Sequence, residues 1–164
     1  MSNDWKIFLE DFRRTVESSA ERLRSITEEQ SEVGRAEGKW SPKEIVGHLI
    51  DSAANNHQRF VRGQFSENMV FPGYDQNQWN EVQQYAHESW LLLVELWRLY
   101  NLHLLHVMSC ADREKLKRSH GEHSLNKIAW ELVGEKEPAT LEYVMRDYVE
   151  HLKHHLQQIF GESV

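Results

Sequence analysis

The sequence predicts an all-α protein, a four-helix bundle that forms a single domain over residues 1–164. Several long segments repeat apolar residues at steps of three, four and seven, which is the spacing of one helix face. No segment alternates apolar and polar residues in the manner of a β-strand, and no repeat recurs at a fixed period. Prolines occur only at positions 42, 72 and 138, where long helical patterns begin or pause. These observations indicate four helices packed around one core.

The first two helices are marked by an apolar face and by a capping signal. The first helix is predicted over residues 4–29. The side chains that would point toward the core are those of Trp5, Phe8, Phe12, Val16, Leu23 and Ile26. The second helix is expected to follow Ser41, because Ser41, Pro42 and Glu44 are typical of an N-cap, a first helical position and a capping box. It should end near Gly63, before a stretch rich in turn-forming residues.

The third and fourth helices follow from longer apolar patterns. The third is predicted as one continuous helix, the longest element, from about Asn77 to Val107. Its inward face would consist of Trp79, Val82, Trp90, Leu93, Val94, Trp97, Tyr100, Leu104 and Val107. Between residues 111 and 137 the pattern weakens, and the segment IAWEL indicates a short extra helical segment of one or two turns. The fourth helix follows Pro138 and should bury Leu141, Val144, Tyr148, Leu152 and Ile159.

The composition argues against several classes of partner and compartment. The chain has 19 Lys and Arg against 26 Asp and Glu, a net charge of -7, which repels the phosphates of nucleic acids. It has no apolar run of the roughly 18 residues that a membrane span requires, and its first residues lack the apolar core of a signal peptide. Cys110 is the single cysteine, so no intramolecular disulfide can form. We therefore expect a cytoplasmic protein that binds neither nucleic acid nor membrane.

Three of the ten histidines lie close together in the fourth predicted helix. At 100° per residue, His151 and His155 stand about 40° apart on adjacent turns, whereas His154 points to the other side of His151. The pair borders the apolar face near Tyr148, so both imidazoles should point inward. Such an i, i+4 pair is a common way to bind zinc or nickel, but two hydrogen-bonded core or surface histidines have the same spacing. The spacing alone leaves both interpretations open.

A third metal ligand would have to come from another element, and the second helix offers two histidines. His57 falls within the apolar arc of that helix, and His48 falls outside it. His48 instead shares a continuous polar stripe with Asp51, Ser52, Asn55 and Arg59. Such a stripe is either a solvated face or the wall of a pocket, and helical periodicity alone favours the solvated face.

Three strings of the sequence resemble the DinB/YfiT-like superfamily of metal-binding four-helix bundles. They are GKWSPKEIVGHLIDSAANNHQRF in the second helix, YDQNQW at the start of the third, and DYVEHLKHHLQQI in the fourth. The resemblance is clear from about Trp40 onward and rests on pattern alone in the first helix. It implies that the metal ligands are His48, His151 and His155. His57 would then be a packing residue, and His154 a neighbour of the site.

The resemblance also implies roles for the polar stripe of the second helix. Asp51 would orient an imidazole or the metal-bound water, or act as the catalytic base. The substrate pocket would be lined by Ser52, Asn55, Arg59 and Trp79, with Tyr74 near its mouth. In a thiol-dependent reaction, Arg59 would pair with a carboxylate of the thiol cofactor.

The resemblance implies an enzyme with one divalent ion, zinc or nickel, whose open coordination positions take water and a small-molecule substrate. The ion would activate water for hydrolysis, or would bind and activate a low-molecular-weight thiol for S-transfer. The sequence leaves both reactions open, together with a non-catalytic alternative: a metal-binding helical dimerisation or stress-response module. A fourth protein ligand, from His87 or His123, would indicate the non-catalytic module. The bundles that the chain resembles often pair, so we expect a homodimer.

Overall fold

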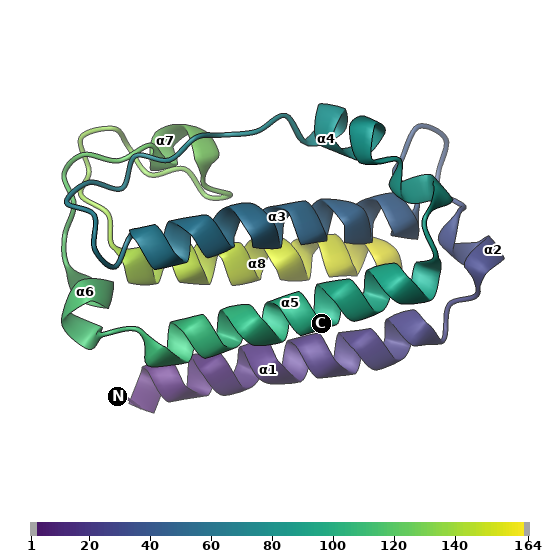
Figure 1. Cartoon of the computed structure of the whole chain (residues 1–164), viewed down its shortest axis with the longest axis horizontal. Coiled ribbons are helices and arrows are strands. Elements are labelled where there is room, and N and C mark those ends of the chain that lie inside the picture. Colours follow the sequence, from purple (N-terminus) through teal and green to yellow (C-terminus); the bar gives the residue numbers. More distant parts are fainter. Residues whose placement is uncertain (1–2, 163–164) are drawn as a thin grey trace.

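Four long α-helices form the body of the molecule in the computed structural model, which describes residues 3–162 (Figure 1). They are α1 (Asn3–Arg24), α3 (Pro42–Arg62), α5 (Trp90–Cys110) and α8 (Leu141–Phe160). The described residues contain no strand and only two isolated β-bridges. None of their helices is long and apolar enough to cross a membrane. The predicted all-α four-helix bundle is therefore confirmed.

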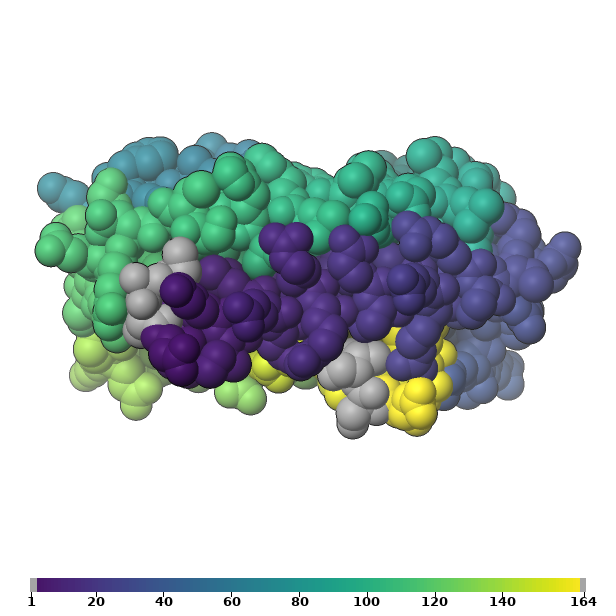
Figure 2. Space-filling view, turned by 90° about the horizontal axis from the view of Figure 1, so that it is seen from below, coloured from purple at the N-terminus to yellow at the C-terminus, as the bar shows by residue number. Residues whose placement is uncertain are grey.

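The long helices do not simply alternate in direction (Figure 1). When the colours are followed, α3 and α5 run the same way along the bundle, and α1 and α8 run the opposite way. Because consecutive parallel helices need a connection that returns along the bundle, residues 63–89 cross its whole length. This crossover carries α4 (Gln76–Gln83) and the short 3-10 helix η1 (Tyr85–His87), and both pack against α3. On the opposite face, α1 and α5 lie side by side (Figure 2).

Side-chain caps fix the ends of the two helices that matter most for the site. The Ser41 side chain accepts a hydrogen bond from the backbone N–H of Glu44, and the Glu44 carboxylate accepts one from the backbone N–H of Ser41. The predicted start of this helix, α3, is confirmed. The fourth long helix, α8, follows the N-cap Thr140 rather than Pro138, and it ends at Gly161, whose φ of 77° is left-handed.

The prediction of one continuous third helix is wrong, because this part of the chain forms three separate elements, α4, η1 and α5. Gln84 ends α4 in the left-handed conformation, with a φ of 51°, and a right-handed helix cannot pass through such a residue. Trp79 and Val82, predicted to point inward, are 38% and 80% exposed. The apolar residues keep their helical spacing on both sides of Gln84, so the pattern does not reveal that one residue between them is left-handed. Among the described helices, α1 with 22 residues is also longer than α5 with 21.

Two other segments are less helical than the sequence predicts. The first long helix ends at Arg24, and the remainder of its predicted span forms a separate turn, α2 (Glu28–Ser31), capped by Thr27. Of the segment IAWEL, only Ile128 is helical, at the end of α7 (Leu125–Ile128). The residues that follow it are held by side chains rather than by a helix, as described below.

The segment between α5 and α8 is fastened to the crossover by backbone hydrogen bonds. It contains α6 (Arg113–Lys117) and α7. The N–H of Met69 donates to the carbonyl of Glu122 over 3.0 Å, and the N–H of Ser124 donates to the carbonyl of Met69 over 3.2 Å. The two long connections therefore support each other over the same part of the bundle, to the upper left in Figure 1.

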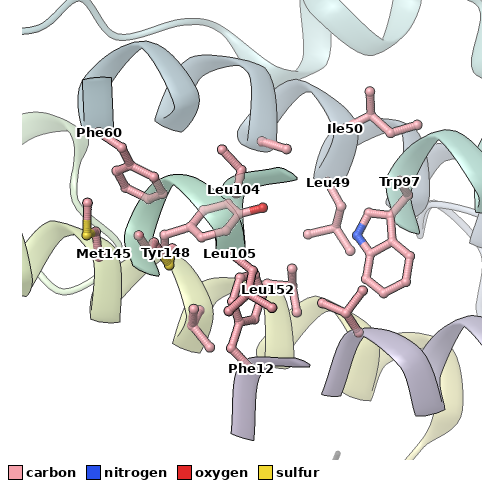
Figure 3. Close-up of a cluster of buried hydrophobic side chains, with 14 of the residues drawn as sticks. Phe12, Leu49, Ile50, Phe60, Trp97, Leu104, Leu105, Met145, Tyr148 and Leu152 are labelled. Atoms are coloured by element: carbon pink, nitrogen blue, oxygen red, sulfur yellow. The ribbon is translucent and has the colours of Figure 1, made fainter. Parts of the chain in front are cut away.

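The core is one cluster of apolar side chains from all four long helices, with residues of each labelled in Figure 3. The residues predicted to be inward in α8 are all buried: Leu141, Val144, Tyr148, Leu152 and Ile159. The buried Tyr148 hydroxyl donates to Asn101 Oδ1 over 2.6 Å, and Asn101 Nδ2 donates to the carbonyl of Trp97 over 2.8 Å. These polar groups are satisfied inside the core, which keeps the cost of burying them low.

A glycine in α3 permits close packing of η1. A Cβ atom added to Gly47 would lie 2.2 Å from Cδ2 of the Tyr85 ring, so only glycine leaves room for this ring. Tyr85 is 7% exposed, and its hydroxyl donates to Asp51 Oδ1 over 2.7 Å. The contact thus brings the crossover onto the same helix that carries the polar stripe.

We expect Gly47→Ala to destabilise the protein by about 1–3 kcal/mol, because the Tyr85 ring must move and its bond to Asp51 is strained or lost. This loss should exceed the gain of up to about 1 kcal/mol in helix propensity. Gly121→Ala is the control, since nothing lies within 4 Å of a Cβ there. Urea unfolding of both variants measures the difference, and equal stabilities would contradict the contact.

Candidate metal centre

Three histidines from two long helices converge between α3 and α8. One nitrogen from each of His48, His151 and His155 lies within 4.8 Å of the corresponding nitrogens of the other two. The Nε2 atoms of His48 and His151 are 3.3 Å apart. The His155 ring centroid lies 4.6 Å from that of His48 and 4.5 Å from that of His151. Among residues 3–162, no fourth His, Cys, Asp or Glu joins this group.

The polar side chains of an amphipathic helix usually face solvent, but the bundle encloses these imidazoles. His48 is 2% exposed and His155 is 8% exposed, and His151 is half-buried. On α8, the four-residue spacing sets His151 and His155 on adjacent turns of the face toward α3. On α3, the polar stripe is covered by α8 and by the crossover, so it is a wall inside the molecule rather than a solvated face.

The nitrogens that point away from the centre have distinct surroundings. His155 Nδ1 lies 3.0 Å from Gln158 Oε1, which can only accept, so Nδ1 carries the proton and Nε2 is left with the lone pair. His151 Nδ1 lies 3.5 Å from Ser52 Oγ. His48 Nδ1 is buried without a hydrogen-bond partner, and so is Oδ2 of Asp51, three residues further along α3. Each histidine can therefore direct one nitrogen to the centre, which fits a divalent ion held by three imidazoles.

Burial makes all three imidazoles difficult to protonate. It lowers the pKa of His48 to about 3, that of His151 to about 2 and that of His155 to about 4, from an ordinary value of 6.5. The positive charge of a neighbouring imidazole adds to this effect at each site. At neutral pH the three rings are uncharged, which is the form that binds a metal ion.

Aromatic rings surround the three histidines. The Trp40 ring lies 5.2 Å from that of His48, and the Tyr74 ring lies 6.5 Å from it on the crossover. The Trp130 ring, which follows α7, lies 5.3 Å from that of His151. Trp130 is a site residue that the sequence did not reveal, because it lies in the predicted short helical segment IAWEL and no motif relates that segment to the histidines. Only the long-range hydrogen bonds of that segment place it there.

Two cavities border different histidines of the group. The smaller, of about 200 Å³, is bounded by α3, α8, residues 73–76 and residues 127–130, and His48 and His151 line it. The larger, of about 820 Å³, is lined by His155 together with Trp40, residues that follow α1, and the end of α8. Each of the three histidines therefore lines one of the cavities, which leaves room for further molecules at an ion held there, as catalytic sites require.

The polar stripe of α3 divides between two neighbours. Measured from His48 at 100° per residue, Ser52, Asn56 and Arg59 lie at about +20 to +80°, and all three line the smaller cavity. Asp51 and Asn55 lie at about -20 to -60°, on the side of α4 and η1. The placement of Asn55 in the pocket wall is therefore corrected: its amide donates to the carbonyl of Asp51 over 2.9 Å, and Asn56 lines the cavity instead.

Trp79 and Asp51 also differ from the roles that the resemblance implies. Trp79 lines neither cavity and packs against Tyr74, which does line the smaller one, with ring centroids 4.9 Å apart. Asp51 is 3% exposed, accepts from Tyr85 Oη and Gln83 Nε2 over 2.7 Å each, and lines neither cavity. Burial raises the pKa of this carboxyl group. Asp51 is thus too enclosed to act as a base on a molecule in either cavity.

The remaining candidate histidines are engaged elsewhere. His57 Nδ1 lies 3.4 Å from Tyr100 Oη, and its ring packs on His103. His154 Nε2 accepts from the Gln158 amide. His123 Nε2 donates to the carbonyl of Glu137 over 2.6 Å, which fastens the segment before α8, and His87 is exposed in η1. Neither candidate for a fourth ligand reaches the centre.

Comparisons with known proteins agree with this architecture. Residues 11–159 match the sequence profile of the DinB superfamily. Over 115 residues, 69% of this chain, the sequence is 28% identical to a protein of Oceanobacillus iheyensis named "putative metal-dependent hydrolase". Over 112 residues, 67% of this chain, it is 26% identical to a protein of Bacillus mycoides with the same description. The matches cover 65% and 64% of those relatives, so the chain spans less than two thirds of their lengths.

One solved structure resembles nearly the whole molecule. It is YfiT from Bacillus subtilis, described as "a probable metal-dependent hydrolase with an unusual four-helix bundle topology". The TM-score is 0.77 at 21% sequence identity, with 98% of this chain and 87% of that chain covered. At this level of identity the likeness supports the fold, and the activity has to be argued from the site.

The metal-free protein should lose stability as the pH falls from 7 to 5. The folded pKa values of the three histidines lie below 6.5, so the unfolded chain binds more protons in this interval. Their contribution is fully present above about pH 6.5 and declines as the pH falls toward the folded values. Denaturant unfolding at a series of pH values measures the slope.

His151→Gln should reduce the proton uptake on unfolding near pH 5 by about one proton per molecule. His87→Gln, at an exposed position in η1, is the matched control and should keep the slope of the parent protein. If His151→Gln also kept the full slope, the account of buried neutral imidazoles would be wrong.

Proposed function

Because the chain belongs to the DinB superfamily, we propose that it is a metal-dependent hydrolase of a small molecule, with a centre formed by His48, His151 and His155. The observation that carries the proposal is the convergence of three neutral imidazoles, two buried and one half-buried, beside a cavity. Zinc and nickel are the ions whose ligand preferences such a centre suits. When bound there, such an ion acts as a Lewis acid that polarises a substrate oxygen and activates water near neutral pH.

The chain's own residues would hold this centre in shape. Gln158 Oε1 accepts a hydrogen bond from the Nδ1–H of His155, and Ser52 Oγ faces Nδ1 of His151. These contacts keep both rings in a fixed orientation. Asn56 Nδ2 in turn donates to the backbone carbonyl of Ser52 over 2.9 Å. Trp40 and Trp130 pack against the histidine rings and exclude water from their flanks. The substrate would enter the smaller cavity, where His48 and His151 are exposed to it.

Asp51 has a positioning role in this proposal. Its Oδ1 is held by Tyr85 and Gln83, and its Oδ2 and the Nδ1 of His48 are both buried without partners. A carboxylate that accepts the second N–H of a ligating histidine fixes its ring and raises its basicity. We propose that Asp51 serves His48 in this way when a metal ion is bound.

A thiol S-transferase is the second candidate, and the observation that favours it is the presence of two cavities that border different histidines of the group. A transferase must bring two molecules to one centre, and the larger cavity has room for a low-molecular-weight thiol beside His155. In the hydrolase, this larger cavity would instead take part of the substrate or water. Catalytic assays with and without added thiol separate the two activities.

The protein loaded with zinc or nickel should contain about one equivalent of metal, measured by plasma mass spectrometry. His48→Ala should lower the content to below about a tenth, because two imidazoles on one helix form a weaker site than three. His154→Ala is the matched control on α8 and should keep the metal. Hydrolysis of a panel of aryl esters and amides should follow the metal content across these variants.

Each alternative outcome of this experiment has a meaning. Turnover only in the presence of a thiol would identify the transferase. One equivalent of metal without any turnover would leave the non-catalytic metal-binding module. Loss of metal in His57→Ala, with full retention in His48→Ala, would contradict the proposed ligands.

Asp51→Asn should weaken metal binding by about 10–100-fold, the usual effect of removing a carboxylate behind a ligating histidine. Competition with a chromophoric chelator measures this affinity. Asp11→Asn is the control, since that carboxylate pairs with Lys153 and not with a residue of the centre. Unchanged affinity in Asp51→Asn would show that Asp51 serves only to hold Tyr85.

A further inference from the structure

The smaller cavity is polar and carries an unbalanced charge. Three charged side chains line it: Arg59 of α3, Lys127 of α7 and Asp147 of α8. Two cations against one anion give a net charge of +1, whereas the whole chain carries -7. A cavity that is positive within an acidic protein attracts anions selectively.

Arg59 is the cation that lies deepest in the wall of this cavity. It is 8% exposed, so more than nine-tenths of the residue is buried. Its Nη1 donates to Asn56 Oδ1 over 3.3 Å, and its Nη2 donates to the carbonyl of Pro72 over 3.4 Å. Both acceptors are neutral and both distances are long for hydrogen bonds. Burying a guanidinium group on such contacts is costly, because a charge removed from water normally requires an anionic partner.

The guanidinium group keeps donors for a further molecule. It has five N–H donors, and the two hydrogen bonds just described leave three unused. Arg59 lines the cavity, and its Nε is not among the buried nitrogens that lack a partner, so the guanidinium group borders the cavity with donors to spare. The burial lowers the pKa of Arg59, as expected of a charge with incomplete compensation.

Asp147 does not supply the missing partner. Its carboxylate accepts the N–H groups of Trp130 over 2.9 Å and of Glu131 over 2.7 Å, which holds the end of the α7 segment. It forms no ion pair with Arg59 among the described residues, and acts on that guanidinium group only through its charge. Burial raises the pKa of Asp147, and the positive charge of Arg59 offsets this only in part.

The geometry of α3 relates Arg59 to the histidines. Arg59 follows His48 by eleven residues, which places it about 20° around the helix and about 16 Å along the axis. Ser52 and Asn56 lie between them and line the same cavity. The guanidinium group turns back along the helix, because its Nη1 donates to Asn56, about one turn nearer to the histidines. A linear molecule in the cavity can therefore extend along α3 with one end at the histidines and the other at Arg59. The volume of about 200 Å³ is below that of drug-sized pockets, which restricts the substrate to a small molecule.

We propose that Arg59 binds the anionic group, a carboxylate or a phosphoryl group, of a small substrate whose reacting end lies at the three histidines. The planar fork of an arginine suits two oxygen atoms of either group. This inference rests on the proposed function for the reacting end alone, because the anion site itself consists of protein side chains. It assigns the substrate class: short, anionic molecules rather than neutral ones.

The first test measures binding of small anions to the metal-free protein by NMR titration. The probes are butyrate, propylphosphonate and the neutral butyramide. At least one anion should bind, butyramide should not, and the stronger of the two anions identifies the carboxylate or the phosphoryl group. Arg59→Gln, which keeps N–H donors for Asn56 and Pro72, should weaken anion binding at least tenfold, and Arg59→Lys should restore part of it.

Arg62→Met is the matched control, because Arg62 is an exposed arginine in the last turn of the same helix. It should leave anion binding unchanged. Absence of binding by both anions to the parent protein would overturn the proposal, and so would equal affinities in Arg59→Gln and the parent protein. In the latter case Arg59 would only fasten the crossover at Pro72, and Arg59→Gln would alter unfolding rather than anion selectivity.

A second test uses the protein loaded with zinc. Linear dicarboxylates from glutarate to sebacate are compared with butyrate. The best of them should bind at least tenfold more tightly than butyrate, and Arg59→Gln should abolish this difference. If no metal is bound, the proposed function fails while the first test still decides the anion site. If metal is bound and no dicarboxylate has an advantage in the parent protein, the two ends do not lie in one cavity and the proposal fails.

Discussion

The burial of three neutral imidazoles between α3 and α8 is the constraint on which the rest of the structure depends. Two amphipathic helices would ordinarily turn such polar side chains to solvent. Here His48 and His155 are almost fully enclosed, and burial holds all three histidine pKa values far below 6.5. Each uncharged ring can present an unprotonated nitrogen to the space between the rings, so this space suits a divalent ion. Burying these imidazoles costs free energy in the metal-free protein, and binding of an ion between them would recover part of this cost.

The unusual helix order makes this burial possible. Because α3 and α5 are parallel, the chain between them must cross the bundle, and it does so over the polar face of α3 (Figure 1). The crossover brings Tyr85 onto Asp51 and Tyr74 to the smaller cavity, and the segment before α8 brings Trp130 to the histidines. A shorter connection would leave the stripe in water. The topology therefore converts a polar helix face into a site with a covered centre and two approaches.

The sequence predicts what is local and misses what depends on distant contacts. Ser41 and Glu44 mark the start of α3, and the spacing of His151 and His155 implies a shared face, because both signals lie within two turns of one helix. Periodicity alone favours His57, which lies in the more apolar arc of the helix, and predicts that the stripe of His48 faces solvent. The apolar spacing of one helix does not show which distant segments cover it. It was the motif resemblance that favoured His48. Trp130 and Asp147 were missed for the same reason, because the backbone N–H of Trp130 donates to Asp147 of α8 and periodicity carries no signal of this tertiary hydrogen bond. The break at Gln84 was missed because one left-handed residue leaves the apolar spacing intact.

Zinc K-edge X-ray absorption spectroscopy on the zinc-loaded protein tests the central claim most directly. The outer-shell scattering of imidazole rings reports how many histidines bind the ion. The account predicts three imidazoles at about 2.0–2.1 Å, with light oxygen or nitrogen atoms completing the coordination and no sulfur. It also predicts two imidazoles in His48→Ala after forced loading at high zinc concentration. Two imidazoles in the parent protein, or a sulfur ligand from Cys110, would contradict it.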